Sequence, residues 1–164
     1  MAHTIEGSNK ARGFRFALVV SRYHDFVTDR LQAAALEALA AADVASDDVT
    51  VIKVPGAFEI PAAAQRAAES RQFDAVVCLG CVIRGGTPHF EYLASAVAHG
   101  ITNAASATGV PMAFGILTTN SVEEALERAG TRSANKGWEA AAAAVEMATL
   151  MKRIGQRAAP GIPV

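Results

Sequence analysis

The chain has 164 residues, a formal net charge of −1 and a hydrophobic fraction of 51%. This length suits one domain with a sizeable core, and the near-neutral charge, which includes no basic run, argues against nucleic-acid binding. A mean hydropathy of +0.22 is high for a small soluble protein. It favours an oligomer, with a monomer of closely packed Ala-rich helices as the alternative.

The sequence carries no signal for membrane insertion or export. Its apolar runs are too short to span a bilayer, and residues 1–13 are polar, with Lys10 and Arg12 in place of an apolar core. These residues do not have the pattern of a signal peptide, so we expect a cytoplasmic protein without a membrane partner.

Strand and helix patterns alternate along the chain. Apolar runs predict four strands, at residues 14–20, 49–54, 75–82 and 111–118. Helical periodicity predicts five helices, at residues 28–42, 60–70, 88–108, 121–128 and 134–153. Because the connections are short, the strands should be parallel with right-handed crossovers. This order predicts a three-layer α/β/α sandwich with a four-stranded parallel sheet, of the flavodoxin-like class.

The domain organisation follows from the same patterns. We expect a single domain at residues 14–154, preceded by a flexible arm at residues 1–13 and followed by a tail at residues 155–164. The arm either adds a strand to the edge of a neighbour's sheet or is disordered.

Local signals define two helix starts and the role of the cysteines. Pro61 falls in the first turn of its helix, where proline is tolerated, and Ser121 with Glu124 has the spacing of a capping box. Cys78 and Cys81 lie three apart in a strand, so their side chains should point to opposite faces. This favours a structural role for both thiols over redox chemistry or metal binding.

The segment after the third strand is the most informative part of the chain. An apolar run ends in Arg-Gly-Gly-Thr-Pro at residues 84–88, and a helical pattern then begins at His89. Ligands of open α/β sheets sit at the carboxyl ends of strands, where a helix N-terminus attracts anions. Histidine titrates closest to neutral pH. The pattern therefore predicts phosphate binding beside a proton-transfer group.

The other strand ends add aromatic and charged side chains at the same edge of the sheet. Tyr23 and His24 follow the first strand, and Phe58 and Glu59 follow the second. Aromatic faces with a few polar groups suit a flat heterocycle. Each residue alone also has a structural interpretation, because Tyr23 can be a loop aromatic and Phe58 a contact at a helix start.

Two cations near the C-terminal helix leave similar alternatives open. Arg128 lies near the end of a helix, where a positive charge is favourable in any case. Lys136 lies near the start of a helix, where a positive charge is unfavourable, so it indicates an anionic partner. We therefore expect a condensation between a heterocycle and a phosphate-bearing substrate.

Four motifs in this order go beyond spacing. They are VPGAFEIP at residues 54–61, GCVIRGGTPHFEY at 80–92, FGILTT at 114–119, and ERAGT at 127–131 with NKG at 135–137. Together they closely resemble the 6,7-dimethyl-8-ribityllumazine synthase family, and the likeness extends from about Phe14 to about Ile154. The resemblance implies a transferase of riboflavin biosynthesis. Such an enzyme condenses 5-amino-6-(D-ribitylamino)uracil with 3,4-dihydroxy-2-butanone 4-phosphate, releasing phosphate and water, without a cofactor or metal.

The resemblance also implies a role for each matching residue. Tyr23 would stack on the pyrimidinedione, where Phe or Trp is usual, and His89 would transfer protons. Arg128 would grip the phosphate bidentately. Ala57, Phe58 and Glu59 would line the ribityl chain and the ring, and the backbone of Cys81, Val82 and Ile83 would bond the uracil edge. Gly86 and Thr87 would bind the phosphate. Phe114, Arg128 and Lys136 would be supplied by the adjacent subunit. His24 departs from the family's common asparagine, and Cys81 from a small residue.

Assembly is a further implication of the resemblance. The family forms pentamers, which some members stack as decamers or close into icosahedral capsids, and riboflavin synthase is implied as a further partner. The connection at residues 130–137 is short, which favours shell formation. Three competing functions are a shell protein without turnover, a lumazine or flavin carrier, and a flavodoxin-type electron carrier. Arg128 and the Gly86–Thr87 turn argue against the lumazine or flavin carrier, which would not need a phosphate grip.

Overall fold

Four parallel strands form one sheet in the order β2-β1-β3-β4. The computed structural model describes residues 1–157. The strands are β1 (Phe16–Ser21), β2 (Val49–Val54), β3 (Ala75–Ile83) and β4 (Met112–Thr119). Because the chain passes from β1 to β2 on one side and then to β3 on the other, the strand order reverses between β1 and β3. Such a switch point is where open α/β sheets bind ligands.

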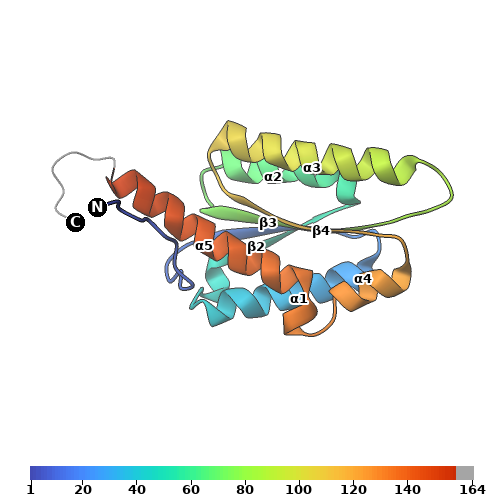
Figure 1. Ribbon diagram of the computed structural model, residues 1–164, viewed down its shortest axis with the longest axis horizontal. Coiled ribbons are helices and arrows are strands. Elements are labelled where there is room, and N and C mark those ends of the chain that lie inside the picture. Colours follow the sequence, from blue (N-terminus) through green and yellow to red (C-terminus); the bar gives the residue numbers. More distant parts are fainter. Residues whose placement is uncertain (158–164) are drawn as a thin grey trace.

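Helices cover both faces of this sheet. Figure 1 shows α2 (Ile60–Glu69) and α3 (His89–Thr108) on one face, and α1 (Asp25–Ala41), α4 (Val122–Arg128) and α5 (Lys136–Arg157) on the other. Alternate residues of β1 supply the two cores: Phe16 and Leu18 pack on the α1 and α5 side, whereas Ala17 and Val19 pack on the α2 and α3 side. The predicted three-layer sandwich is confirmed.

The central strand β3 carries both cysteines. It is buried from Ala75 to Val82, as expected for a strand that is covered on both faces. Cys78 belongs to the core beneath α2 and α3, and Cys81 to the opposite core, as their spacing predicts. Both are free thiols, and burial raises the pKa of Cys78 to about 12 and that of Cys81 to about 11.

Two helices differ in length from their sequence patterns. The helix expected from residue 28 begins at Asp25, because the carbonyl of His24 already accepts hydrogen bonds from the N–H groups of Val27 and Thr28. The last helix, α5, continues to Arg157, so the first three residues of the expected tail at 155–164 are helical. Good helix formers such as Lys152 and Arg153 precede them. The rest of that tail lies outside the described residues.

The segment at residues 1–13 contains no helix or strand, yet part of it lies against the domain. The N–H of Ser8 donates to Thr149 Oγ1 at 2.8 Å, and the N–H of Ala11 donates to the carbonyl of Ala42 at 2.9 Å. Ala11 is only 1% exposed. Residues 8–11 are therefore docked on α1 and α5, and a strand added to a neighbour's sheet stays a prediction.

Candidate functional site

A cavity of about 810 Å³ opens where β1, β2 and β3 end. We call it the strand-end cavity. It brings together nine of the residues singled out from the sequence: Tyr23, Ala57, Phe58, Glu59, Cys81, Val82, Ile83, Thr87 and His89. Gly86 is not among its lining residues, although its neighbours Gly85 and Thr87 are.

Two exposed aromatic rings mark the rim of the strand-end cavity. Tyr23 is 69% exposed and Phe58 is 67% exposed, so large apolar faces remain open to solvent. Backbone bonds fix the loop that carries Tyr23: the N–H of Arg22 donates to the carbonyl of Val54 at 2.8 Å, and that of Tyr23 to Pro55 at 3.0 Å. The rings are therefore presented by a fixed scaffold, and an aromatic heterocycle can stack on them.

The floor of the cavity includes a free stretch of strand backbone. β3 pairs with β1 only as far as Leu79, opposite Val20, but pairs with β4 as far as Ile83, opposite Thr119. The backbone of residues 81–83 therefore has β4 on one side and no β1 partner on the other. Unpaired N–H and C=O groups are strong hydrogen-bonding sites, and they can read the edge of a planar ligand.

The turn after β3 leads into the N-terminus of α3. His89 is the first residue of α3, and no side chain caps the helix there. A Cβ added to Gly85 or Gly86 would meet no atom within 4 Å, so the turn is open to a ligand. Free N–H groups at a helix start attract anions. The geometry suits a phosphate beside the imidazole of His89.

Charges in the strand-end cavity are few. Among the described residues, the lining includes His24, Glu59 and His89 but no lysine or arginine. Burial lowers the pKa of His24, which favours its neutral form at neutral pH. Its ring lies 4.4 Å from that of Tyr23, between ring centroids. No group of three or more metal-ligating side chains occurs within residues 1–157.

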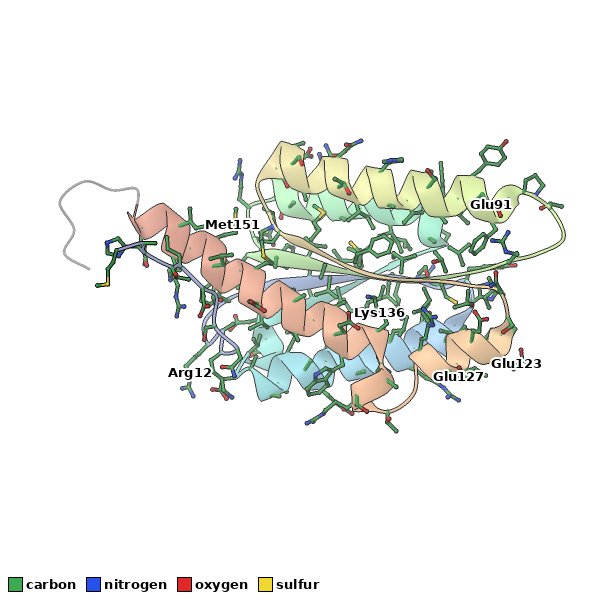
Figure 2. All side chains as sticks on the ribbon, in the orientation of Figure 1. Arg12, Glu91, Glu123, Glu127, Lys136 and Met151 are labelled. Carbon is green, nitrogen blue, oxygen red and sulfur yellow. The ribbon has the colours of Figure 1, made fainter. Side chains whose placement is uncertain are left out.

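A second cavity, of about 390 Å³, lies beside the edge strand β4. We call it the edge-strand cavity. It brings together Phe114, Arg128 and Lys136, and Figure 2 shows Lys136 at the start of α5. Phe114 is 40% exposed, and the ammonium of Lys136 lies 3.2 Å from Glu139 Oε1. The two cavities have no lining residue in common.

Asn135 and Gly137 fix the position of Lys136. Asn135 Oδ1 accepts the N–H of Gly137 at 2.8 Å, and its amide donates to the carbonyl of Gly130 at 3.0 Å. A Cβ on Gly137 would lie 2.1 Å from the carbonyl oxygen of Leu31. Only glycine allows α5 to cross α1 this closely, so the motif NKG has a structural basis.

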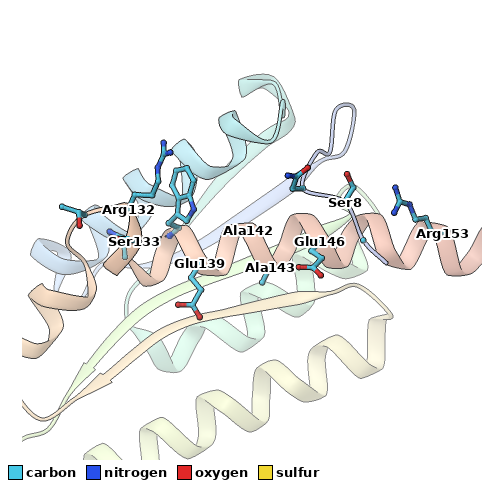
Figure 3. Close-up of a pocket in the computed structure, with 13 residues that line it drawn as sticks. Ser8, Arg132, Ser133, Glu139, Ala142, Ala143, Glu146 and Arg153 are labelled. Carbon is cyan, nitrogen blue, oxygen red and sulfur yellow. Dashed lines mark hydrogen bonds between the residues drawn. The ribbon is translucent and has the colours of Figure 1, made fainter. Parts of the chain in front are cut away.

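Figure 3 shows a third cavity, of about 1230 Å³, along α5. It extends from residues 7–9 to the segment before α5 and includes Trp138, whose ring lies 3.9 Å from the guanidinium carbon of Arg132. None of the residues singled out as substrate contacts lines it. Ser133 and Glu139 line both this third cavity and the edge-strand cavity, so these two cavities are adjacent.

Several lining residues escaped the sequence analysis. His89, Leu93 and Ala96 recur at i, i+4 and i+7, so helical periodicity on α3 could have found the last two. His24 and Gly85 were predicted at this edge of the sheet without an assigned substrate contact, and the other lining residues that were not predicted as contacts are Gly56, Phe90, Tyr92 and Val122. Those of the edge-strand cavity are Ile116, Leu117, Thr118, Ser133, Ala134 and Glu139.

Comparisons with known proteins identify the family. A family model described as 6,7-dimethyl-8-ribityllumazine synthase matches residues 13–152. A 6,7-dimethyl-8-ribityllumazine synthase of Syntrophus aciditrophicus (strain SB) is 51% identical over 154 residues, which cover 94% of this chain and 100% of the relative. One of Desulfatibacillum aliphaticivorans is 48% identical over 153 residues, covering 93% and 99%. No helix within residues 1–157 is long and apolar enough to cross a membrane. The chain belongs to the 6,7-dimethyl-8-ribityllumazine synthase family, transferases of riboflavin biosynthesis.

Proposed function

We propose that this chain carries out its family's reaction at a site that two subunits build together. The reaction condenses 5-amino-6-(D-ribitylamino)uracil with 3,4-dihydroxy-2-butanone 4-phosphate to the lumazine, phosphate and water. In this proposal one subunit supplies the strand-end cavity and a neighbouring copy supplies the edge-strand cavity.

The complementarity of the two cavities is the observation that carries the proposal. The strand-end cavity has aromatic faces, open backbone and a helix N-terminus, but no lysine or arginine among its described lining residues. The edge-strand cavity has two cations, Arg128 and Lys136, and one exposed ring, Phe114. Cationic donors strengthen the grip on a phosphate, and of the two cavities the edge-strand cavity has them among its described lining residues.

The strand-end residues then have distinct tasks. Tyr23 and Phe58 hold the uracil ring between or against their faces, and the backbone of residues 81–83 bonds its edge. Glu59 and Ala57 lie beside the ribityl chain. Gly86 and Thr87 receive the phosphate at the start of α3, where Arg128 of the neighbouring copy completes its binding.

The chemistry needs proton transfers more than a strong nucleophile. The substrate amine attacks the ketone, and loss of water from the carbinolamine gives an imine. Proton removal then expels phosphate and unmasks the second carbonyl, and the ribityl nitrogen attacks it to close the ring with loss of water. His89 takes and returns protons in these steps. Holding both substrates together accounts for much of the acceleration, since the amine is already nucleophilic.

Assembly completes the proposal. If each copy gives one half of a site to the next copy, a closed ring completes every site. For this ring we propose a homopentamer, with closure into an icosahedral capsid as the further step that the short connection at residues 130–137 favours. The two free, buried cysteines suit a reducing compartment, so we place the enzyme in the cytoplasm.

A mixing experiment tests the shared site. The variants Phe58→Ala and Arg128→Ala each damage one half, and lumazine absorbance follows activity, with phosphate-free butanone as the control substrate. After joint unfolding and refolding at equal amounts, about a quarter of the interfaces in a random ring would combine two intact halves. We expect the mixture to recover activity well above either variant alone. Activity that stays at the level of the parents, in rings shown to be mixed, would contradict a shared site.

A further inference from the structure

Arg84 joins three segments around the phosphate turn. Its backbone N–H donates to the carbonyl of Thr119 at 2.8 Å, and its side-chain Nε donates to Asn120 Oδ1 at 2.8 Å. Its guanidinium pairs with the carboxylate of Glu91 and lies 4.4 Å from the centre of the Phe90 ring. Figure 2 labels Glu91 in the first turn of α3. One side chain therefore connects the end of β3, the start of α3 and the end of β4.

The turn between Arg84 and Glu91 has little support of its own. Gly85 and Gly86 have no atom near an added Cβ, and glycines lose the most conformational freedom on ordering. Arg84 bonds to Glu91 across the turn, seven residues along the chain. This contact closes the turn and limits the positions that its N–H groups and the first residues of α3 can adopt.

The partners of Arg84 are themselves held in place. The N–H of Asn120 donates to Glu124 Oε2 at 3.1 Å, and Ser121 Oγ accepts the N–H of Glu124 at 3.1 Å. Phe90 packs against the core beneath α3 and lines the strand-end cavity. Arg84 therefore anchors the turn to two fixed points, the start of α4 and the wall of the cavity.

We propose that Arg84 is a positioning residue that holds the Gly85–Thr87 turn in the shape that binds the phosphate-bearing substrate. The inference rests on the proposed role of this turn. The hydrogen bond from Arg84 lowers the pKa of Glu91, as expected for a carboxylate that is paired with a guanidinium. An exposed ion pair by itself contributes little stability. The fork geometry of the guanidinium lets Arg84 bond to Asn120 and Glu91 at the same time, and lysine cannot reproduce this geometry.

The main alternative is that Arg84 contacts the phosphate directly. The two roles differ in what Glu91 and Asn120 do. If Arg84 acts by anchoring the turn, removing either partner weakens binding of the phosphate substrate. If Arg84 contacts the phosphate, freeing it from Glu91 makes it a better ligand and strengthens that binding.

Steady-state kinetics with each substrate varied in turn tests the proposal. We expect Arg84→Met to raise KM for the butanone phosphate about tenfold, and Glu91→Gln and Asn120→Ala about threefold, with KM for the ribitylaminouracil changed less than about twofold. Arg84→Lys should restore little, because it keeps the charge but loses the fork. Arg66→Met, an exposed arginine on α2, is the matched control and should behave as the wild type.

The outcomes separate this inference from the proposed function. A KM for the butanone phosphate that stays at the control value in Arg84→Met, or falls in Glu91→Gln, overturns the positioning role. Thr87→Ala and Arg128→Ala, measured in parallel, test the phosphate site itself. If they raise this KM and the Arg84 variants do not, only the inference about Arg84 fails. If Arg84→Met does not fold, Glu91→Gln, whose carboxylate is exposed, carries the test.

Discussion

The strand-end and edge-strand cavities are built from different parts of the chain and by different means. The strand-end cavity comes from the segments that follow β1, β2 and β3, with the end of β3 and the first turns of α3, and aromatic and small residues are prominent in its lining. The edge-strand cavity comes from one strand and from residues 128–139, and it carries the cations. In the proposed reaction the planar substrate binds in the strand-end cavity, and the phosphate also needs the cations of the edge-strand cavity, which has no lining residue in common with the first.

Under the proposed shared site, this difference is the reason for a partner copy. Turns and strand ends can supply aromatic stacking and backbone hydrogen bonds within one subunit. The cations depend on the helices α4 and α5, which lie on the other face of the sheet from α3 (Figure 1). Changes in either half should consequently have distinct effects, and four substitutions test this, beginning with the largest expected effect.

Gly137→Ala should disturb the edge-strand cavity most strongly. Its Cβ would lie 2.1 Å from the carbonyl oxygen of Leu31, so α5 would have to move away from α1 beside Lys136. We expect a loss of about 3 kcal/mol from overpacking and a fall in the apparent melting temperature of about 9 °C. Thermal unfolding followed by circular dichroism measures this effect.

The same helix provides the control for this prediction. Gly155 also lies in α5, but a Cβ there would meet no atom within 4 Å. Gly155→Ala should leave stability unchanged or raise it slightly, since alanine is the better helix former. Equal melting temperatures for the two alanine variants would mean that the α1–α5 crossing tolerates a side chain at residue 137.

Arg128→Ala should have the largest effect on activity. Removing a charged, two-donor partner of the phosphate should lower kcat/KM about 100-fold. Arg128→Lys keeps the charge but not the fork, so we expect a loss of about tenfold. The lumazine assay measures both. If Arg128→Ala retains full activity, the edge-strand cavity is not the phosphate-binding half.

The elements were predictable because their signals are local. Apolar runs identified the strands, Pro61 lies in the first turn of α2, and Ser121 accepts the N–H of Glu124 as an N-cap should. The capping box itself differs in detail. Glu124 accepts from the N–H of Asn120 instead of that of Ser121. A sequence pattern indicates that a glutamate returns to the helix start, but backbone geometry decides which N–H it meets.

Contacts between distant segments were beyond the sequence pattern. Periodicity does not show that Arg84 reaches Asn120, 36 residues away, or that Ser8 meets Thr149. Periodicity also does not show that Phe114, Arg128 and Lys136 line a different cavity from Tyr23 and His89. Their position depends on how α4 and α5 pack against the sheet. The family resemblance implied that these three residues serve a site in the adjacent subunit, and in this chain they line a cavity other than the strand-end cavity.

His89→Ala should lower kcat less than Arg128→Ala lowers kcat/KM. We expect a loss of about tenfold, below the usual range for acid–base groups, because juxtaposing the two substrates supplies much of the rate. His89 lies beside Thr87 in the strand-end cavity, but the proposal gives the phosphate grip to the turn and to Arg128, so the effect should fall mainly on kcat and less on KM for the butanone phosphate. A loss greater than that of Arg128→Ala would make proton transfer, instead of phosphate binding, the dominant contribution.

The smallest effect is expected at His24, in the dependence of stability on pH. Burial lowers the pKa of His24 below its ordinary value of 6.5, so the unfolded chain binds a proton more readily than the folded one. Below pH 6.5, stability should therefore fall with pH until the folded imidazole is also protonated, and no further. His24 has φ 62°, a conformation that asparagine tolerates. His24→Asn should thus melt like the wild type above neutral pH and lose less on acidification. If the melting temperatures of the wild type and of His24→Asn fall equally between pH 8 and pH 5, burial of this imidazole does not affect folding.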